Sequence, residues 1–384
     1  MRVLLYQFFP GGGIGRYTHE LASHLMIQPG IDLSVVCSPD FEWLEHAEYD
    51  VRPLLPSLRH SNPALRRVRF GAAQFEAPRR LFRLAREESA DVIHFSNINH
   101  ISYPFWRRWI PDGICIAATA HDVKRATSMV SKRWEDSSLK AFYRRADALF
   151  VHSELQSEEL REWADCDSGR ISIVPHGIYN YPDAAGDQTW CRRRLGLPED
   201  APLGLFFGHV RDEKNLQSLI EAMADPRTCS HLLVAGRGGA RGHRSVADYR
   251  QAVNDLGLRH RVHFLEDYIA EDEVGQVFTA CDWVSLAYRS AFSSQSGVLN
   301  VAMYFKRPVI TTPAPTLSHT AAKFKIGVQA KDDEAAGIAG AVALMESQLR
   351  SRTVFQFEEY AAHYNWQENA CRTRARYEHV AQSA

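Results

Sequence analysis

Short apolar runs alternate with segments of helical periodicity along the whole chain. The runs occupy residues 3–8, 33–37, 92–95, 114–119, 148–151, 171–174, 203–207, 232–235, 262–265, 283–287 and 309–311. Runs this short, apolar throughout and rich in β-branched residues are typical of strands buried on both faces of a parallel sheet. Segments 16–26, 215–224 and 246–256 have the spacing of amphipathic crossover helices. The pattern predicts an α/β protein with two doubly wound, Rossmann-like domains.

The alternation of strands and helices stops once, in the turn-rich stretch 179–188. We therefore expect a first domain at residues 1–182 and a second at 183–356. The tail, 357–384, again has helical periodicity and is expected to contain one last helix over 357–380. A chain of 384 residues is long enough for two such domains.

Composition narrows the classes of protein. The net charge is −1. Nucleic-acid-binding proteins usually have an excess of basic residues, so no nucleic-acid partner is expected. The seven cysteines form no CxxC pair and no Cys/His ligand spacing, which indicates a reducing compartment and no structural metal. No run approaches the roughly 18 apolar residues that span a bilayer. We expect a cytoplasmic protein, which leaves room for peripheral contact with the inner face of a membrane.

A glycine-rich turn, GGGIGRY, follows the first apolar run at residues 11–17. Glycines at this position let the backbone approach an anion, and the following helix N-terminus adds partial positive charge. A plain tight turn is the alternative interpretation. The dinucleotide spacing GxGxxG is absent, because Arg16 or Thr18 stands where the third glycine would be, and this disfavours an NAD enzyme.

Two further polar groups follow predicted strands. His121 and Asp122 come directly after the run 114–119, where they could hydrogen-bond sugar hydroxyls or position an acceptor. A loop histidine beside a helix-capping aspartate is the alternative. Arg211 and Lys214 follow the first run of the second domain, and two cations at a strand end suit a diphosphate, although a solvated charge run would look the same.

The sequence SSQSGV at residues 293–298 precedes another helical segment. Small hydroxylated residues and a glycine at a helix start expose backbone N–H groups, which predicts a second anion-binding turn. The stretch 57–86 is different, since it interleaves arginines, including Arg66, Arg67 and Arg69, with apolar side chains. It predicts a surface for anionic lipid or for a lipid diphosphate acceptor. A solvated helix with an ordinary buried stripe is the alternative.

Eight segments in this order, GGGIGRY, HD, VHSELQSEEL, VPHGI, GHVRDEKN, LLVAGRG, VHFLEDYI and AMYFKRPVI, resemble the landmarks of the retaining glycosyltransferase family 4 (glycosyl transferases group 1). They cover nearly the whole chain. The resemblance implies a GT-B fold, in which two Rossmann-like domains face a central cleft and the C-terminal domain holds the nucleotide. It also implies that the last helix crosses back onto the first domain, and that catalysis needs no metal or other cofactor.

The resemblance also implies roles for individual residues. The donor or acceptor would meet Gly12 and Gly13, and the transferred sugar would lie near His121, with Asp122 a candidate base. Lys214 would neutralise the diphosphate. Tyr268 and Ile269 would meet the base, and Ser296, Gly297 and Val298 would offer amides to the β-phosphate. His209 and Ser293 are further donor-binding candidates. Apart from the resemblance, Arg16, Arg66, Arg67 and Arg69 are candidates for contact with an acceptor or membrane.

The sequence departs from the family pattern at three positions. His209 stands where the family usually has an arginine, and Arg211 is the candidate replacement. The two family glutamates would fall at Ser293 and Val301, neither of which is acidic. The contacts that hold the donor are therefore expected to differ from those usual in the family.

We expect a retaining enzyme that transfers a sugar from a UDP- or GDP-sugar to a glycan or polyprenyl-diphosphate-linked acceptor, in the assembly of exopolysaccharide or cell-surface polysaccharide. Two other classes stay open. A non-catalytic protein that binds a nucleotide sugar or glycan is favoured by the missing glutamates. A sugar-nucleotide epimerase would share the architecture but needs carboxylates for proton abstraction.

Overall fold

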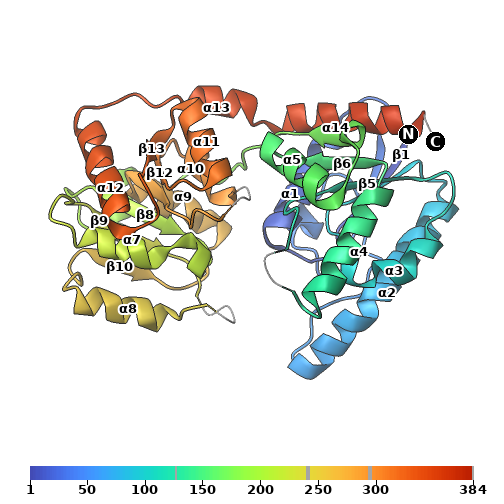
Figure 1. Ribbon diagram of the computed structural model, residues 1–384, viewed down its shortest axis with the longest axis horizontal. Coiled ribbons are helices and arrows are strands. Elements are labelled where there is room, and N and C mark those ends of the chain that lie inside the picture. Colours follow the sequence, from blue (N-terminus) through green and yellow to red (C-terminus); the bar gives the residue numbers. More distant parts are fainter. Residues whose placement is uncertain (126–127, 239–242, 293–295, 383–384) are drawn as a thin grey trace. The chain divides into compact units, whose positions relative to one another are not determined.

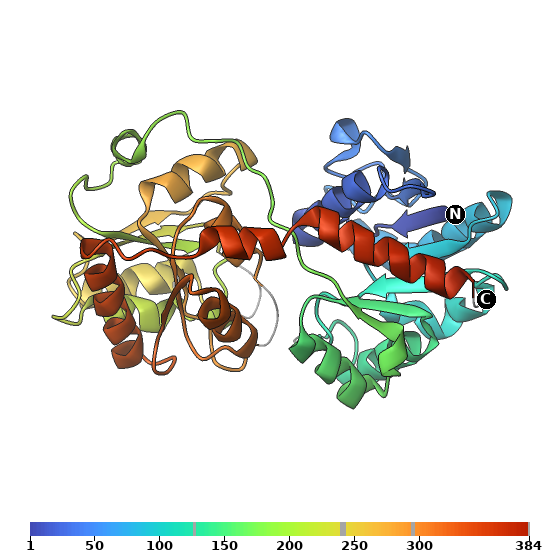
Figure 2. The same cartoon turned by 90° about the horizontal axis from the view of Figure 1, so that it is seen from above.

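The computed structural model describes residues 1–125, 128–238, 243–292 and 296–382, and it divides into two compact units (Figures 1 and 2). The first unit comprises Met1–His176 together with Asn365–Ala384, and the second comprises Gly177–Tyr364. The chain therefore leaves the first unit six residues before the expected boundary at 182. It returns at residue 365, so the tail is shared between the units.

The first unit is built on a seven-stranded sheet in which every pairing is parallel. Its strand order is β3-β2-β1-β4-β5-β6-β7. The strands are β1 (Arg2–Tyr6), β2 (Asp32–Val36), β3 (Asp50–Arg52), β4 (Val92–Phe95), β5 (Cys115–Thr119), β6 (Ala148–Val151) and β7 (Ile171–Ile173).

Helices cover both faces of this sheet, as a parallel sheet requires. The core on one face contains side chains of α2 to α5, while α1 and α14 contact each other on the opposite face. The helices are α1 (Gly12–Leu25), α2 (Pro63–Glu87), α3 (Tyr103–Trp106), α4 (Lys132–Arg145), α5 (Glu154–Ala164) and α14 (Trp366–Ala381), with short 3-10 helices η1 (Leu44–His46), η2 (His100–Ser102), η3 (Arg107–Trp109) and η4 (Ser168–Arg170).

The second unit has a six-stranded parallel sheet of order β10-β9-β8-β11-β12-β13. Its strands are β8 (Leu203–Phe207), β9 (His231–Ala235), β10 (Val262–Leu265), β11 (Trp283–Leu286), β12 (Val309–Thr311) and β13 (Gly327–Gln329). Its helices are α6 (Gln188–Arg194), η5 (Asp212–Lys214), α7 (Leu216–Met223), α8 (Val246–Asp255), α9 (Glu271–Ala280), α10 (Gly297–Tyr304), α11 (Pro315–Phe324), α12 (Ala335–Arg350) and α13 (Phe357–His363). Two separate hydrophobic clusters, one on each face, make the core.

All eleven predicted strands are present, with ends that shift by one or two residues. The predicted fold class, two doubly wound α/β domains, is confirmed. Two strands, β3 and β13, were not predicted. Each has three residues and lies at the outer edge of its sheet, and each includes polar or glycine positions, so neither forms an apolar run.

The tail forms two helices where one was expected over 357–380. The first helix ends just before Tyr364. The side chain of Asn365 then caps α14 by accepting a hydrogen bond from the backbone N–H of Glu368 at 2.7 Å. Helix α13 belongs to the second unit and α14 to the first. Figure 2 shows α14 lying along the helices and strands of the first unit.

Buried polar contacts fix α14 on its sheet. Asn369 donates to the carbonyl of Pro175 at 2.6 Å and to the Tyr17 hydroxyl at 3.3 Å. The Tyr377 hydroxyl contacts Nδ1 of His94, a fully buried residue of β4. Burial lowers the pKa of His94 to about 3, so the imidazole is neutral and serves as a structural hydrogen-bonding group.

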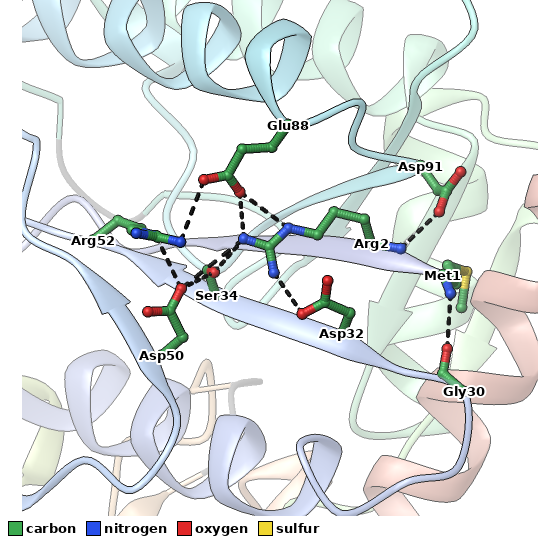
Figure 3. Close-up of polar contacts among 9 residues, drawn as sticks. All are labelled: Met1, Arg2, Gly30, Asp32, Ser34, Asp50, Arg52, Glu88 and Asp91. Carbon is green, nitrogen blue, oxygen red and sulfur yellow. Dashed lines mark hydrogen bonds and ion pairs between the residues drawn. The ribbon is translucent and has the colours of Figure 1, made fainter.

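A cluster of charges closes the amino end of the first sheet (Figure 3). The guanidinium of Arg2, 14% exposed, contacts Asp32 at 2.7 Å and Glu88 at 3.0 Å, and lies 3.9 Å from Asp50. Arg52 joins the cluster at 2.9 Å from Asp50. Because these residues come from β1, β2, β3 and the turn after α2, Arg2 links four segments.

Replacing Arg2 with Met should lower the free energy of unfolding by about 2 kcal/mol, because three carboxylates then lose their shared partly buried counter-ion. Much of the loss should disappear at about 1 M NaCl, since salt screens carboxylate repulsion. Urea denaturation at both salt concentrations measures this. The matched variant Arg193→Met breaks a fully exposed pair with Glu199 and should stay near wild type; equal effects of the two substitutions would contradict the role given to Arg2.

Candidate functional site

The order of the first sheet reverses between β1 and β4, and ligands of such sheets bind outside the carboxyl ends of the strands at this point. The glycine turn lies there. Gly12 has a φ of +76°, which a β-carbon disfavours, and added β-carbons at Gly12 and Gly13 would meet open space. The Glu42 carboxylate approaches this turn and accepts from the Gly12 N–H at 3.3 Å. The protein thus places a carboxylate of its own at the predicted anion position.

His121 is part of an aromatic cluster centred on Tyr17 of α1. The Tyr17 ring contacts His121, His152, His176 and Trp366 at centroid distances of 4.6, 5.2, 5.3 and 5.1 Å. The three histidines follow β5, β6 and β7, so the carboxyl ends of neighbouring strands bring them together. Only His121 was predicted as a site residue.

The hydrogen bonds of this cluster fix the tautomer of His121. His152 Nδ1 lies 3.2 Å from the carbonyl of Val174, which can only accept, so Nδ1 carries the proton and Nε2 of His152 is an acceptor. His121 Nδ1, 3.4 Å from that Nε2, must then be the donor. The Nε2 atom of His121 keeps a lone pair, is shielded from solvent and has no partner among the described residues. In the part of the chain that the structure describes, this buried lone pair is an unused hydrogen-bond acceptor beneath the carboxyl ends of the strands.

Burial keeps this cluster uncharged. Desolvation, followed by the neighbouring histidines His152 and His176, holds the pKa of His121 well below its usual value. The pKa of His152 is lowered to about 3, mainly by burial. The same environment raises the pKa of Tyr17 to about 12. At neutral pH these groups therefore offer hydrogen bonds without charge.

Two other candidates of the first unit have partners within it. Asp122 lies 4.0 Å from the Arg125 guanidinium, and its carbonyl accepts from Tyr143 at 3.5 Å. Arg16 forms a largely buried ion pair with Glu20 at 3.0 Å, so it is not part of an exposed basic surface. Asp122 remains a candidate base, whereas Arg16 is placed beside the glycine turn rather than toward solvent.

Arg66, Arg67 and Arg69 lie on the first turns of α2, which extend away from the rest of their unit (Figure 1). All three are exposed, and the apolar neighbours Leu65 and Val68 are 48% and 68% exposed. The buried stripe of α2 begins only at residue 73. The alternative of an ordinary buried stripe therefore holds for the second half of the helix but not for the first.

The second sheet reverses its order between β8 and β11, and Lys214 lies at this point. Lys214 Nζ donates to the carbonyl of Phe207 at 2.9 Å and lies 5.8 Å from the Tyr288 ring. A β-carbon on Gly208, whose φ is +88°, would come within 3.1 Å of this Nζ. Burial, then the charge of Arg211, lowers the pKa of Lys214 to about 8. Among the described residues no carboxylate lies within ion-pairing distance of Lys214.

Tyr288 connects Lys214 to the second predicted anion turn. Its ring faces Lys214, and its hydroxyl is 3.0 Å from the hydroxyl of Ser296, the residue that precedes α10. The Ser296 side chain does not cap α10, and an added β-carbon at Gly297 would meet open space. The first backbone N–H groups of α10, including that of Val298, are thus turned to the same end of the sheet as Lys214. Sequence reasoning missed Tyr288, although it directly follows a predicted strand.

The other candidates of the second unit lie at the carboxyl ends of neighbouring strands. His209 and Arg211 are exposed, and burial, then Arg211 and Lys214, lowers the pKa of His209. Tyr268 is 72% exposed after β10, and Ile269 packs against the core.

The two family glutamate positions were expected at Ser293 and Val301. Ser293 lies outside the described residues. Val301 is 4% exposed within the core, so this position is filled by an apolar side chain.

No group of three or more His, Cys, Asp or Glu that could hold a metal ion occurs in the described part of the chain. Nor is any helix within that part long and apolar enough to cross a membrane. The first unit offers neutral hydrogen-bonding groups, and the second offers cations and backbone N–H groups.

Comparison with known proteins identifies the family. Residues 11–179 match the model of Glycosyltransferase Family 4, and residues 201–347 match that of Glycosyl transferases group 1. The chain belongs to the glycosyltransferases of this family. It is 26% identical over 235 residues to a D-inositol 3-phosphate glycosyltransferase of Stackebrandtia nassauensis, an alignment that spans 59% of this chain and 52% of the relative. A Corynebacterium glutamicum enzyme of the same name is 28% identical over 246 residues, spanning 60% and 57%.

The chain thus spans about half the length of the curated relatives it matches. Solved structures show the fold of the family. The alignment with a sucrose-phosphate synthase of Thermosynechococcus elongatus covers 100% of both chains, with a TM-score of 0.75 and 18% identity. The HepE protein of Anabaena, solved with UDP and glucose, covers 100% of this chain and 98% of its own, with a TM-score of 0.67 and 16% identity. The GT-B prediction of two Rossmann-like domains is confirmed.

The neutral histidines predict a dependence of stability on pH. An unfolded histidine titrates near pH 6.5, whereas His152 titrates near 3 in the fold, so stability is lost as pH falls below 6.5. Between pH 7 and 5 this group should remove about 2 kcal/mol from the free energy of unfolding. His152→Gln should flatten that decline, measured by chemical denaturation at both pH values. The exposed His46→Gln is the control, and an unchanged slope in His152→Gln would refute the assignment.

Proposed function

We propose that the protein is a retaining, metal-independent hexosyltransferase that takes a UDP- or GDP-sugar as donor. The observation that carries this is Lys214: a partly buried cation with no carboxylate partner among the described residues, at the sheet's reversal point and linked through Tyr288 and Ser296 to the start of α10. A donor diphosphate would supply the missing negative charge. UDP is supported further by the HepE structure, which contains UDP and glucose.

In the proposed reaction the departing diphosphate is stabilised electrostatically. Lys214 and Arg211 would neutralise it, and the amides at Gly297 and Val298 would bind its oxygens. His209 would lie beside the diphosphate, and Ser296 would orient Tyr288 against Lys214. The acceptor hydroxyl would attack the face from which the leaving group departs, and Asp122 or the departing phosphate would take its proton. Tyr268 and Ile269 would contact the base.

His121 would bind a sugar hydroxyl in this proposal. Its Nε2 lone pair, which has no partner among the described residues, would accept a hydroxyl hydrogen once the side chains that shield it move, and its depressed pKa keeps the imidazole neutral. Gly12 and Gly13 would lie beside the donor phosphates or the acceptor; a phosphate at the turn would have to displace the Glu42 carboxylate, whereas an acceptor hydroxyl could donate to it. We propose a glycan or polyprenyl-diphosphate-linked acceptor in polysaccharide assembly, in the cytoplasm at the membrane surface. The relatives named for inositol 3-phosphate offer a second acceptor chemistry.

Lys214→Ala should reduce transfer by at least about 100-fold with the fold intact, because the departing diphosphate would lose the cation proposed to neutralise it. Thermal shifts with a panel of UDP- and GDP-sugars measure donor binding before any acceptor is known. Wild-type donor binding should weaken as pH rises above about 8, where Lys214 loses its proton.

The exposed Lys331→Ala is the matched control and should behave as wild type. Undiminished transfer by Lys214→Ala would contradict the role of this residue. Donor binding by the wild type without transfer or hydrolysis of any nucleotide sugar would instead identify a non-catalytic binding protein.

The exposed first half of α2 supports a peripheral membrane contact, with Arg66, Arg67 and Arg69 on anionic headgroups and Leu65 and Val68 at the acyl boundary. Replacing the three arginines by Glu should abolish flotation with vesicles of about 30% phosphatidylglycerol, since each basic residue contributes about 1 kcal/mol near such a surface.

The control variant carries the same change of charge in the second unit, at the exposed Lys323, Lys331 and Arg350. It should float as the wild type does. Equal flotation of the α2 variant and the wild type would remove the basis for this contact.

A further inference from the structure

The first unit carries a second basic site away from the carboxyl ends of its strands. An open pocket of about 520 Å³ lies between α3–η3 and the end of α4. Four arginines line it, Arg107 and Arg108 from η3 and Arg144 and Arg145 from the last turn of α4. Both segments lead into the amino ends of β5 and β6, so the pocket is at the opposite sheet edge from His121.

The protein leaves most of this charge uncompensated. Arg145 lies 3.4 Å from Asp147, but that carboxylate also accepts from the backbone N–H of Ile116 at 2.8 Å. In the described residues no carboxylate lies within 4.0 Å of the side chains of Arg107, Arg108 or Arg144. The whole chain has a net charge of −1, so this concentration of positive charge is local.

Helix stabilisation explains only part of the arrangement. Arg144 and Arg145 lie in the last turn of α4, where cations interact favourably with the helix dipole. That effect does not account for Arg107 and Arg108, which belong to another segment and line the same pocket. The four guanidinium groups are exposed, so solvent screens much of their mutual repulsion, and a bound anion would remove the rest.

The fifth polar lining residue is Tyr103. Its ring is buried against Trp106 and Phe142, and its hydroxyl makes no hydrogen bond within the part of the chain that the structure describes. Burial raises the pKa of Tyr103, while Arg145 and Arg107 lower it. A neutral phenol O–H therefore joins the guanidinium donors at the pocket.

We propose that this pocket binds a phosphate-bearing polyanion with two or more phosphate groups. Guanidinium groups bind phosphate oxygens through paired N–H donors, and four of them match the charge of a diphosphate better than that of one carboxylate. The volume is in the range of small-molecule sites. The ligand is either a soluble diphosphate or the headgroup of an anionic lipid. The lipid source is included because Phe105, two residues before Arg107, is 44% exposed and is near Trp134, 41% exposed.

Calorimetric titration of the full chain with inorganic pyrophosphate tests the proposal. Arg107→Gln with Arg108→Gln should weaken binding at the pocket at least about tenfold, since two of the four cations are lost. The control variant, Arg194→Gln with Lys331→Gln, removes two exposed charges of the second unit. It should not change pyrophosphate binding at the pocket. Lys214→Ala should keep the pocket site, which separates this proposal from the donor site.

Arg144→Gln is the second variant, and melting temperatures confirm that each variant folds. Flotation with vesicles of about 30% phosphatidylglycerol distinguishes the sources. Weakened pyrophosphate binding with unchanged flotation assigns a soluble diphosphate, and weakened binding with lost flotation assigns a lipid headgroup. The proposal would be overturned if both variants, the double substitution of Arg107 and Arg108 and the single substitution Arg144→Gln, bound pyrophosphate with wild-type affinity and stoichiometry.

Discussion

Parallel strand pairing is the constraint on which the rest of this structure depends. Strands of a parallel sheet are buried on both faces, so most connections cross over as helices, and the helices must cover both faces. The strand order therefore reverses at one point, between β1 and β4 in the first unit and between β8 and β11 in the second. The glycine turn and the Lys214 turn follow the first strands of their units, and both arrive at this reversal. Equivalent topology thus produces two sites from unrelated sequences.

The two sites use the same physics with opposite results. In each site, burial destabilises the protonated, charged form of a basic side chain, as the lowered pKa values of His121 and Lys214 show. The histidine pKa falls far below 7, so the first site presents neutral hydrogen-bonding groups, suited to hydroxyls. The lysine pKa stays near 8, so the second site keeps a cation, and within the described part of the chain no carboxylate pairs with it; this suits a phosphate. In the proposed function, charge recognition and hydroxyl recognition would therefore belong to different units.

Sequence reasoning found the fold because the buried strands are continuous apolar runs. It missed β3 and β13 because a three-residue edge strand pairs on one side only and need not be apolar. It also expected one helix in the tail, since periodicity continues across Tyr364 and Asn365. The backbone leaves the helical region at Tyr364, and the side chain of Asn365 starts a new helix. The break depends on the backbone angles of one residue and the capping side chain of the next. A hydrophobic pattern averaged over many residues does not resolve it.

The candidate site was predictable in position but not in its contacts. Residues directly after strands could be placed, because the sheet fixes that edge. Tyr17 and Tyr288 were missed, since their importance comes from partners far away in the chain. Glu42 is the clearest case, because it lies thirty residues from Gly12 and yet reaches its backbone N–H. A phosphate at this turn would have to displace that carboxylate, whereas a hydroxyl could donate to it. The glycines predict an anion at this helix start, and in the fold the Glu42 carboxylate is the anion that lies there.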